Sequence, residues 1–446
     1  MIQAAPANRD IFTLAWPIAI NAILLQLILV IDTLLVTPLG EESLAAMGVA
    51  ASVAGILVGL LMAFSNGTQL IIAQAFGAKD SKAMSLGFRS GVVINSAIAC
   101  FGILFIFSFG HRLIELIANK ESLVDLSYNY LKIFSVVILG VSVSQNITVF
   151  FNATGNSRIP LYANFLELPV NVVVSLVLIY GFLGFAEMGL AGAAIGSAVA
   201  VTSRALFLVA FYKKKQVIEG GLPSPQLTPA AVKSHWNYAT PIAGTFVSMI
   251  LAGGVCMMIY AKLGINEFAA LVLIAPWIKV AGHLSTAWGQ STGILVGQLL
   301  GNNNWSQLDS FVSRSWRMSF VVAGLISLAY IGMFFLFEAI YPELEQETLD
   351  TLWLFAPILA VTPFIRTSNT ICGHVLRAGG DAKYVFKIHA YTQWFVIVPL
   401  SALFVLYWEL SAVWVFALTL AEELIKGIPF HLRIHSGHWK QRLVGV

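Results

Sequence analysis

Residues 11–36 read IFTLAWPIAINAILLQLILVIDTLLV, and Asp32 is the only charged side chain in this run of 26 residues. A helix that crosses a membrane needs roughly 20 apolar residues, so the run predicts a transmembrane helix. It is too long for the core of a secretory signal peptide and has no small-residue cleavage pattern. We therefore expect it to remain in the protein as the first helix.

The composition extends this interpretation to the whole chain. Of its 446 residues, 58% are hydrophobic and 11% are charged. A soluble globular domain carries about 25% charged residues, so this chain lacks the polar groups to cover a surface exposed to water. The net charge of +3 gives no sign of a nucleic-acid partner. Three cysteines, Cys100, Cys256 and Cys372, lie in apolar runs, where free cysteines usually behave as small buried hydrophobic groups.

The chain repeats itself at an offset of 224 residues, because Pro17 recurs as Pro241 and 241 − 17 = 224. The same offset relates Leu39-Gly40 to Leu263-Gly264, Ala45-Ala46 to Ala269-Ala270, Gln74 to Gln298, Gly77 to Gly301, and Gly155 to Gly379. Two similar halves packed face to face predict a central cleft. One position breaks the symmetry, since Asp32 corresponds to Cys256, and this break indicates where the chemistry lies.

The apolar runs predict an all-helical membrane protein with twelve transmembrane helices. We place six near residues 11–36, 47–72, 84–109, 124–150, 159–183 and 188–212, and six near 237–262, 269–300, 309–338, 350–375, 383–407 and 409–432. We expect an N-terminal six-helix lobe (1–212), a cytoplasmic linker with three consecutive lysines and three prolines (213–236), and a C-terminal six-helix lobe with a short tail (237–446).

The distribution of basic residues predicts the orientation. The two tails and the even-numbered connections hold most of the Lys and Arg, whereas the other connections are largely acidic. Basic loops stay in the cytoplasm, so we expect both termini there and a multi-pass location in the cell inner (plasma) membrane. An even number of spans per half makes the repeat parallel, with its pseudo-axis along the membrane normal.

This organisation favours a transporter that rocks two lobes around a central site. An intramembrane enzyme would need a nucleophile–base pair or a metal cluster, and the sequence has no His/Cys/Asp grouping with ligand spacing and no Gly-rich phosphate loop. We therefore expect no enzymatic activity, no cofactor and no metal site. A channel is the third class, but no ring of like charges or filter-like repeat is visible.

Asp32 is the first candidate for a cation-coupling site, because a carboxylate inside a membrane costs several kcal/mol. Burial disfavours its charged form, so it can bind and release a proton. The alternative is a structural acid paired with a polar group on another helix. Pro17 interrupts the hydrogen bonding of the same helix, as a hinge or as a static kink. Asn21 lies on the face of Asp32 and could line the same substrate cavity.

The fifth predicted helix carries a polar stripe of Asn164, Glu167, Asn171 and Ser175, spaced by three, four and four residues. Glu167 could form a proton relay with Asp32, or reach the cytoplasmic interface near Arg158. Asn171 and Ser175 could serve cation coupling or bond neighbouring helices. Ser197 on the sixth helix, for coupling, and Asn152 at the end of the fourth, for the cavity, are weaker candidates.

The second half has different chemistry. At the fixed offset, Phe395 and Pro399 replace Asn171 and Ser175, and the seventh helix has no acid. We therefore expect the ion chemistry to be confined to the first half. Met257 and Trp277 could form an adaptable pocket for flat cations, although an interfacial aromatic belt is the alternative for any single Trp. Lys279 and Arg366 could pair with lipid headgroups or backbone carbonyls.

Several blocks of the sequence together resemble the multidrug and toxic compound extrusion (MATE) family, from Pro17 to about Glu423. Besides the paired Leu-Gly and Ala-Ala motifs, they are Ala73-Gln74-Ala75-Phe76-Gly77-Ala78-Lys79-Asp80, Ala153-Thr154-Gly155-Asn156-Ser157-Arg158-Ile159-Pro160, Leu376-Arg377-Ala378-Gly379-Gly380-Asp381 and Gly189-Leu190-Ala191-Gly192-Ala193-Ala194. Each is weak alone, but their order, spacing and double occurrence are together specific.

The resemblance implies two six-helix lobes in a V and export by cation antiport. Within the family the chain is most similar to the DinF-like branch, whose helix-1 acid and proline match Asp32 and Pro17. The branch's helix-5 asparagine matches Asn171, and its helix-6 hydroxyl corresponds to Ser197. An acid often found four residues after that asparagine is Ser175 here. Its loss removes a hard anionic ligand for sodium, so the resemblance favours protons.

We therefore expect a monomeric secondary transporter, surrounded by membrane lipids, that exports amphipathic, mostly cationic small-molecule drugs in exchange for protons. Protonation of Asp32 would be coupled to bending of the first helix near Pro17. A sodium-coupled drug antiporter and a flippase for lipid-linked precursors of the same superfamily are the alternatives.

Overall fold

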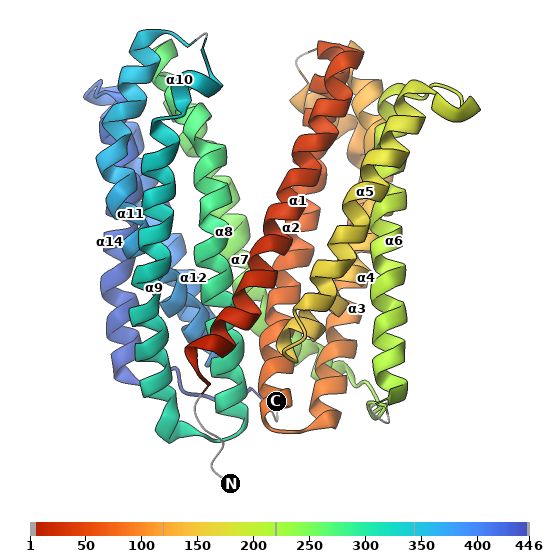
Figure 1. The fold of residues 1–446 in the computed structure, drawn as a ribbon, viewed down its shortest axis with the longest axis vertical. Coiled ribbons are helices and arrows are strands. Elements are labelled where there is room, and N and C mark those ends of the chain that lie inside the picture. The colour runs from red at the N-terminus through yellow and green to blue at the C-terminus, as the bar shows by residue number, and fades with distance from the viewer. Residues whose placement is uncertain (1–5, 119, 219–220, 343, 444–446) are drawn as a thin grey trace. The chain divides into compact units, whose positions relative to one another are not determined.

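The computed structural model describes residues 6–118, 120–218, 221–342 and 344–443, and this part of the chain is helical with no strand (Figure 1). The first half contains α1 (Asn8–Val36), α2 (Glu41–Gly77), α3 (Ser81–Ile117), α4 (Ser122–Ala153), α5 (Arg158–Tyr180) and α6 (Gly189–Ile218). Short 3₁₀ turns, η1 (Thr37–Leu39) and η2 (Phe182–Gly184), follow α1 and α5.

The second half contains α7 (Pro229–Tyr260), α8 (Ile265–Gly301), α9 (Trp305–Phe334), the short α10 (Phe337–Ile340), α11 (Gln346–Ala378) and α14 (Ala412–Ser436). Between α11 and α14 runs one continuous segment of α12 (Ala382–Tyr391), the π-helix η3 (Thr392–Ile397), α13 (Val398–Ala402) and the π-helix η4 (Leu403–Tyr407).

Eleven of the described helical segments are long and apolar enough to cross a membrane. The remaining long helix, α14, carries Glu422, Glu423 and Lys426 in its interior. Lys426 bonds both glutamates at 2.9 and 3.2 Å, so these charges offset one another. The predicted all-helical membrane fold is confirmed, whereas the expected linker is too long. Helix α6 continues to Ile218 and α7 starts at Pro229, since Lys favours helices and proline suits a first helical position.

The described chain divides into two compact units. We call residues 20–76 and 80–240 the N-unit, and residues up to Ala19, 77–79 and from Pro241 onward the C-unit. The division falls inside α1, just after Pro17, and inside α7, just before Pro241. The two prolines of the repeat therefore mark where each of these helices passes from one unit to the other.

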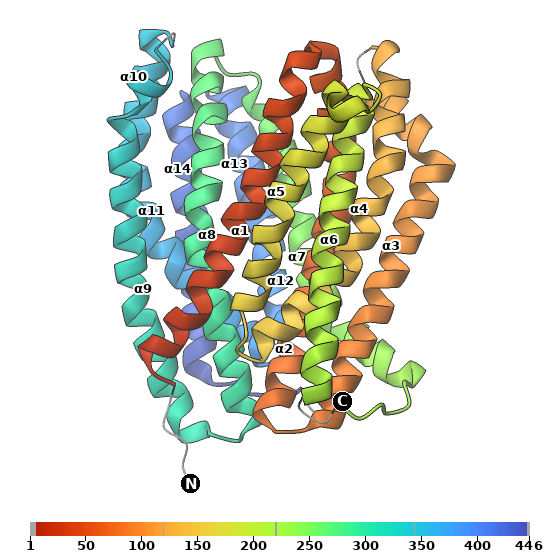
Figure 2. The same ribbon diagram turned by 45° about the vertical axis from the view of Figure 1, so that its right-hand side comes forward.

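Within the N-unit, α1, α5 and α6 lie side by side in both views (Figures 1 and 2). Helices α5 and α6 approach closely because α6 presents glycine at the contact. A Cβ atom on Gly192 or Gly196 would collide with the α5 backbone at Leu178 or Ser175. Small residues permit this approach in membrane bundles, and it sets the position of the polar side chains on α5.

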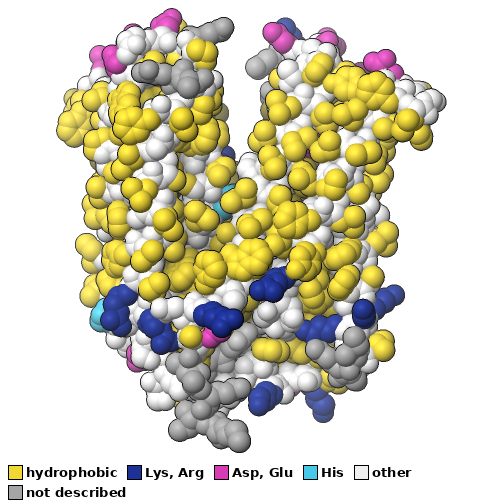
Figure 3. All heavy atoms as spheres, viewed as in Figure 1, with side chains coloured by type: hydrophobic (Ala, Val, Ile, Leu, Met, Phe, Trp, Pro, Cys, Tyr) yellow, Lys and Arg dark blue, Asp and Glu magenta, His cyan; other side chains and the backbone are white. Residues whose placement is uncertain are grey.

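Charged side chains are unevenly distributed on the face drawn in Figure 3. Hydrophobic side chains lie along the helices, most of the visible Lys and Arg lie toward the end from which α1 starts, and most of the visible Asp and Glu lie toward the opposite end. This distribution agrees with the loop charges from which the orientation was predicted.

The backbone shows that the repeat offset is not constant. Lys79 and Asn303 share a left-handed conformation, both with φ of 56°, and 303 − 79 = 224. After α4 and α11 the left-handed residues are Gly155 and Gly380, with φ of 82° and 89°, and 380 − 155 = 225. The predicted correspondence of Gly155 with Gly379 is therefore wrong by one residue, because the second half has an inserted residue before this turn.

The π-helices shift the register further, because each π turn adds a residue to the helix. Segments η3 and η4 lie in the helix that corresponds to α5. The predicted matches of Asn171 with Phe395 and of Ser175 with Pro399 therefore do not hold in space.

The end of the described chain folds back onto the C-unit. Trp439 is fully buried, its indole N–H donates to the Ile434 carbonyl at 3.0 Å, and a Cβ atom on Gly379 would collide with it. Arg442 donates to the carbonyl of Gly301 at 3.3 Å, which provides a partner for an orphan carbonyl at the end of α8.

Replacing Trp439 with alanine is expected to destabilise the protein by about 3–5 kcal/mol, the cost of emptying a buried aromatic site. The measurement is thermal unfolding in detergent. Trp414→Ala is the matched control, because Trp414 is 57% exposed. Equal melting temperatures for the two variants would contradict a role of this tail in stability.

Candidate functional site

The structure brings Asp32, Ser197 and Asn171 together from three helices of the N-unit, and we call them the Asp32 triad. The Ser197 hydroxyl donates to Oδ2 of Asp32 at 3.1 Å. The Asn171 amide donates to the Ser197 oxygen at 3.2 Å. All three side chains are buried, so one residue of the predicted polar stripe, Asn171, is connected to the predicted acid through Ser197.

Local contacts hold α1 beside α5. The Tyr180 hydroxyl donates to the Leu35 carbonyl at 2.8 Å, and the Asn164 amide donates to the Asn21 carbonyl at 3.4 Å. These contacts lie on either side of the Asp32 triad along the helix. Asp32 is four residues from Val36, the last residue of α1, or about 6 Å along the axis at 1.5 Å per residue.

The site has unused bonding capacity. Oδ1 of Asp32, Oδ1 of Asn171 and Oγ of Ser175 are buried and have no hydrogen-bond partner within the described chain. Buried polar atoms are usually paired. Asp32, Asn171 and Ser175 therefore keep acceptor capacity that the described chain does not use.

Asp32 also differs from the other buried acids of the described chain, Glu167 and Glu423. Glu167 lies 3.4 Å from Arg204, and Glu423 lies 3.3 Å from Arg366 and 3.2 Å from Lys426. Asp32 forms no ion pair among the described residues and accepts its bond from a neutral hydroxyl. Its negative charge is therefore the one left without a positive partner.

Glu167 lies inside the N-unit. It is 6% exposed and pairs with the buried Arg204 of α6, and no hydrogen bond joins it to Asp32 within the described chain. Arg204 was not predicted as a site residue, although it is the only charged residue between Glu187 and Lys213. Its isolation in an apolar run was the available signal.

The remaining predicted cavity residues are divided between the two units. Asn21 and Asn164 contact each other, as described above, while Asn152 lies buried at the end of α4. Met257 is 41% exposed on α7. Trp277 packs edge-on against Phe337, with ring centroids 6.4 Å apart.

The C-unit contains a buried ionic network that the sequence analysis missed. Arg366 of α11 donates to Glu423, which also accepts from Lys426 and, at 2.9 Å, from the Asn369 amide. Arg366, for which lipid headgroups or backbone carbonyls were the expected partners, pairs with an acid. The 422–426 spacing of acids and lysine was the signal, since residues three and four apart meet on a helix. Lys279 is exposed.

Among the described residues no three His, Cys, Asp or Glu side chains are grouped so that they could hold a metal ion. The chemistry available at the Asp32 triad is therefore that of one carboxylate, one hydroxyl and one amide from three helices.

Comparison with known proteins identifies the family. The sequence profile of the MatE family matches residues 17–177 and 241–403. The chain belongs to the MATE family of membrane transporters. The matched segments start 224 residues apart, since 241 − 17 = 224, and end 226 apart, since 403 − 177 = 226. The family match thus shows the same drift in offset as the turns and π-helices.

Curated relatives match over nearly their full length. An uncharacterised transporter, YisQ, of Bacillus subtilis is 23% identical, with 98% of this chain and 96% of the relative covered. A probable multidrug resistance protein, NorM, of Thermotoga maritima is 22% identical, with 98% and 94% covered.

Solved MATE structures share the fold. A MATE in the bent conformation superposes with a TM-score of 0.84 at 18% identity, covering 96% of this chain and 95% of the other. An outward-facing multidrug resistance MATE transporter gives a TM-score of 0.84 at 18% identity, covering 98% and 97%. A eukaryotic MATE transporter gives 0.83 at 16% identity, covering 97% of this chain and 96% of the other.

Replacing Glu167 with glutamine is expected to destabilise the N-unit by about 3–5 kcal/mol, because Arg204 would become an unpaired buried charge. The double variant Glu167→Gln/Arg204→Met should recover most of this loss, as measured by thermal unfolding in detergent. Glu187→Gln, at an exposed position, is the control. A Glu167→Gln protein of normal stability that no longer transports would instead indicate the proton relay.

Proposed function

We propose that this MATE transporter is a secondary active exporter of amphipathic, mostly cationic drugs in exchange for protons, and that Asp32 is the coupling residue. The observation that carries the proposal is the absence of any ion pair to Asp32 in the described chain, where Glu167 and Glu423 each have one. An uncompensated charge inside a membrane protein is costly, and a proton removes it.

The surroundings of Asp32 support both protonation states. Burial disfavours the carboxylate, whereas the hydrogen bond from Ser197 favours it. Opposing effects of this kind let the group bind a proton on one side of the membrane and release it on the other. If both termini are cytoplasmic, Asp32 lies near the extracytoplasmic end of α1, where the incoming protons are.

The multidrug part of the proposal is supported by the relatives. Several of them, including those of Thermotoga maritima and Pseudomonas putida, are named as probable multidrug resistance proteins. Aromatic and methionine side chains could bind varied flat cations. Met257 and Trp277 are the candidates in this chain.

Pro17 is proposed as the hinge. Its ring nitrogen cannot donate to the Thr13 carbonyl, so α1 lacks one helical hydrogen bond at this point. The residues before and after this point belong to different compact units, so any relative motion of the units must be absorbed within α1. A solved relative is described as being in a bent conformation, which supports a bend in this family.

Sodium coupling is the second candidate, and one observation favours it. The unpaired oxygens of Asp32, Asn171 and Ser175 are hard ligands of the kind that such cations bind. Only one of them is anionic, which favours the proton.

Asp32→Asn is expected to abolish exchange, because asparagine resembles the protonated acid and cannot release a proton. The measurement is ethidium transport in proteoliposomes under a proton gradient alone and a sodium gradient alone. Asp10→Asn is the matched control, an exposed acid on the same helix. Proton-driven transport that survives in Asp32→Asn would refute the coupling role, and transport driven by sodium alone would select the second candidate.

The hinge predicts a distance change along α1. Spin labels at the exposed Phe12 and Leu34 are 22 residues apart, or about 33 Å along a straight helix. Exposed Cys100 would be replaced by alanine, since Cys256 and Cys372 are buried. Acidification should shorten the distance, Asp32→Asn should shorten it at every pH, and Pro17→Ala should keep it long.

The wild-type protein provides the decisive comparison for the hinge. A label distance that does not change with pH in the wild type would contradict bending driven by Asp32. A Pro17→Ala protein that still shortens would move the hinge elsewhere in α1.

A further inference from the structure

We propose that the C-unit contains a binding site for a small anionic group at Arg366, which receives the carboxylate of a transported amphiphile. The inference rests on the proposed export function and extends it to substrates that carry a negative group. It arises from a pocket between α8, α9 and α11 that the proposed proton coupling does not use.

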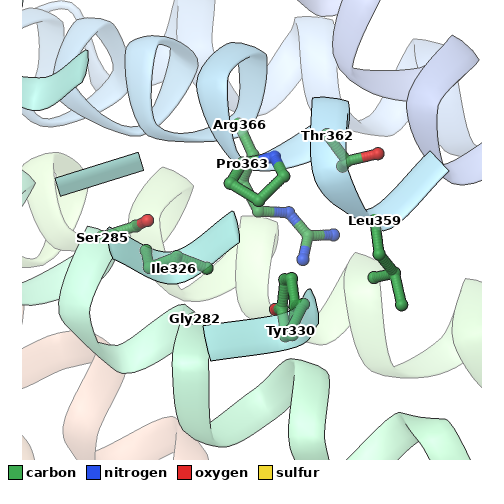
Figure 4. Close-up of a pocket in the computed structure, with 8 residues that line it drawn as sticks. All are labelled: Gly282, Ser285, Ile326, Tyr330, Leu359, Thr362, Pro363 and Arg366. Atoms are coloured by element: carbon green, nitrogen blue, oxygen red, sulfur yellow. The ribbon is translucent and has the colours of Figure 1, made fainter. Parts of the chain in front are cut away.

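The pocket lies wholly within the C-unit. Gly282 and Ser285 of α8, Ile326 and Tyr330 of α9, and Leu359, Thr362, Pro363 and Arg366 of α11 line it (Figure 4). The guanidinium of Arg366 extends into the space beside Tyr330 and Leu359 in this view. The enclosed space is of the order of one water molecule, so it fits the tip of a carboxylate rather than an aromatic ring.

Arg366 is available for a ligand. Its side chain is 34% exposed, while its partner Glu423 is 7% exposed. Only Nε is used for Glu423, at 3.3 Å. A guanidinium has five N–H donors and does not lose its charge in proteins, so the terminal nitrogens provide donors toward the pocket. Arginine pairs well with carboxylates because its planar donor edge matches their two oxygens.

Arg366 shares its acid with a second cation. Lys426 already bonds Glu423 at 3.2 Å, and Glu423 also accepts from Asn369. Glu423 is therefore shared between two cations, Arg366 and Lys426. Glu422, the second acid of the network, bonds Lys426 at 2.9 Å, and no hydrogen bond joins it to Arg366 among the described residues.

Tyr330 provides a second donor. Its hydroxyl lies 3.5 Å from the Ile278 carbonyl, which is at the limit of a hydrogen bond. It can therefore turn to an incoming oxygen at little cost. The hydroxyls of Ser285 and Thr362 are already engaged at 2.7 and 2.6 Å, so Arg366 and Tyr330 would be the direct contacts.

The test compares two ligands that differ in one group, a fluoroquinolone with a free carboxylate and its methyl ester. Their binding to the purified full-length protein is measured by fluorescence titration, alongside ethidium, which has no carboxylate. Arg366→Gln should weaken binding of the acid about tenfold or more, the loss expected for a charge-assisted hydrogen bond. Binding of the ester and of ethidium should be unchanged.

Two controls separate ligand contact from structural damage. Lys279→Gln removes the same charge from an exposed position on α8 and should leave the preference for the acid intact. Arg366→Gln/Glu423→Gln removes both partners and restores the charge balance of the network. If Arg366 contacts the carboxylate, this double variant should still bind acid and ester equally.

The other outcomes are equally informative. The proposal would be overturned if Arg366→Gln lost binding of the acid, the ester and ethidium equally. It would also be overturned if the double variant regained the preference for the acid over the ester. Either result would leave Arg366 a structural residue.

Replacing chloride with gluconate tests whether a free inorganic anion, rather than a substrate carboxylate, is the ligand of this site. If chloride competes with the acid in the wild type but not in Arg366→Gln, the site binds anions through Arg366. If chloride binding is lost with Arg366 but acid and ester bind alike, the substrate carboxylate is overturned as its ligand. Wild-type ethidium exchange tests the export function separately.

Discussion

The cost of placing charge among apolar helices governs this molecule. The buried carboxylates have one of two environments, with a cationic partner or without one. Glu167 and Glu423 lie beside Arg204 and Arg366, which fixes their charge and ties neighbouring helices together. Asp32 accepts a hydrogen bond from the Ser197 hydroxyl, which in turn accepts one from the Asn171 amide. A buried carboxylate with a cationic partner keeps its charge and contributes to the structure. A buried carboxylate without such a partner loses less free energy when it is protonated, so its protonation state can change.

How much the sequence could predict follows from the same physics. Apolar runs long enough to cross a bilayer predicted the helices. The isolated Asp32 and the periodic stripe on α5 predicted two members of the Asp32 triad, whereas Ser197 was a weaker candidate that matched through the family resemblance. The hydrogen bonds between these residues depend on the close approach of α5 and α6 at Gly196. Residue spacing along a single helix gives no information on that approach. The pairs Glu167–Arg204 and Arg366–Glu423 join residues 37 and 57 positions apart, so spacing along one helix could not predict them either.

The constant offset failed for a local reason. An inserted residue before the turn at Gly380 and the π-helical segments of the second half change which residues face one another. A repeat detected in the connections therefore identifies equivalent helices but not equivalent side chains. The drift to 226 at the end of the family match agrees with an insertion of this size.

The corrected register changes the meaning of the asymmetry between the halves. Cys256, the counterpart of Asp32, lies 3.8 Å from the Ser401 hydroxyl, which the Tyr260 hydroxyl also contacts at 2.9 Å. An offset of 226 would pair Ser401 with Ser175, since 401 − 226 = 175. Within the described chain, Asp32 instead bonds Ser197 of the sixth helix, which Asn171 of the fifth helix also contacts. Both halves thus place a hydroxyl beside this position of their first helix. The residue at this position is an acid in the N-unit and a thiol in the C-unit, so the repeat supplies the geometry and a single substitution supplies the charge.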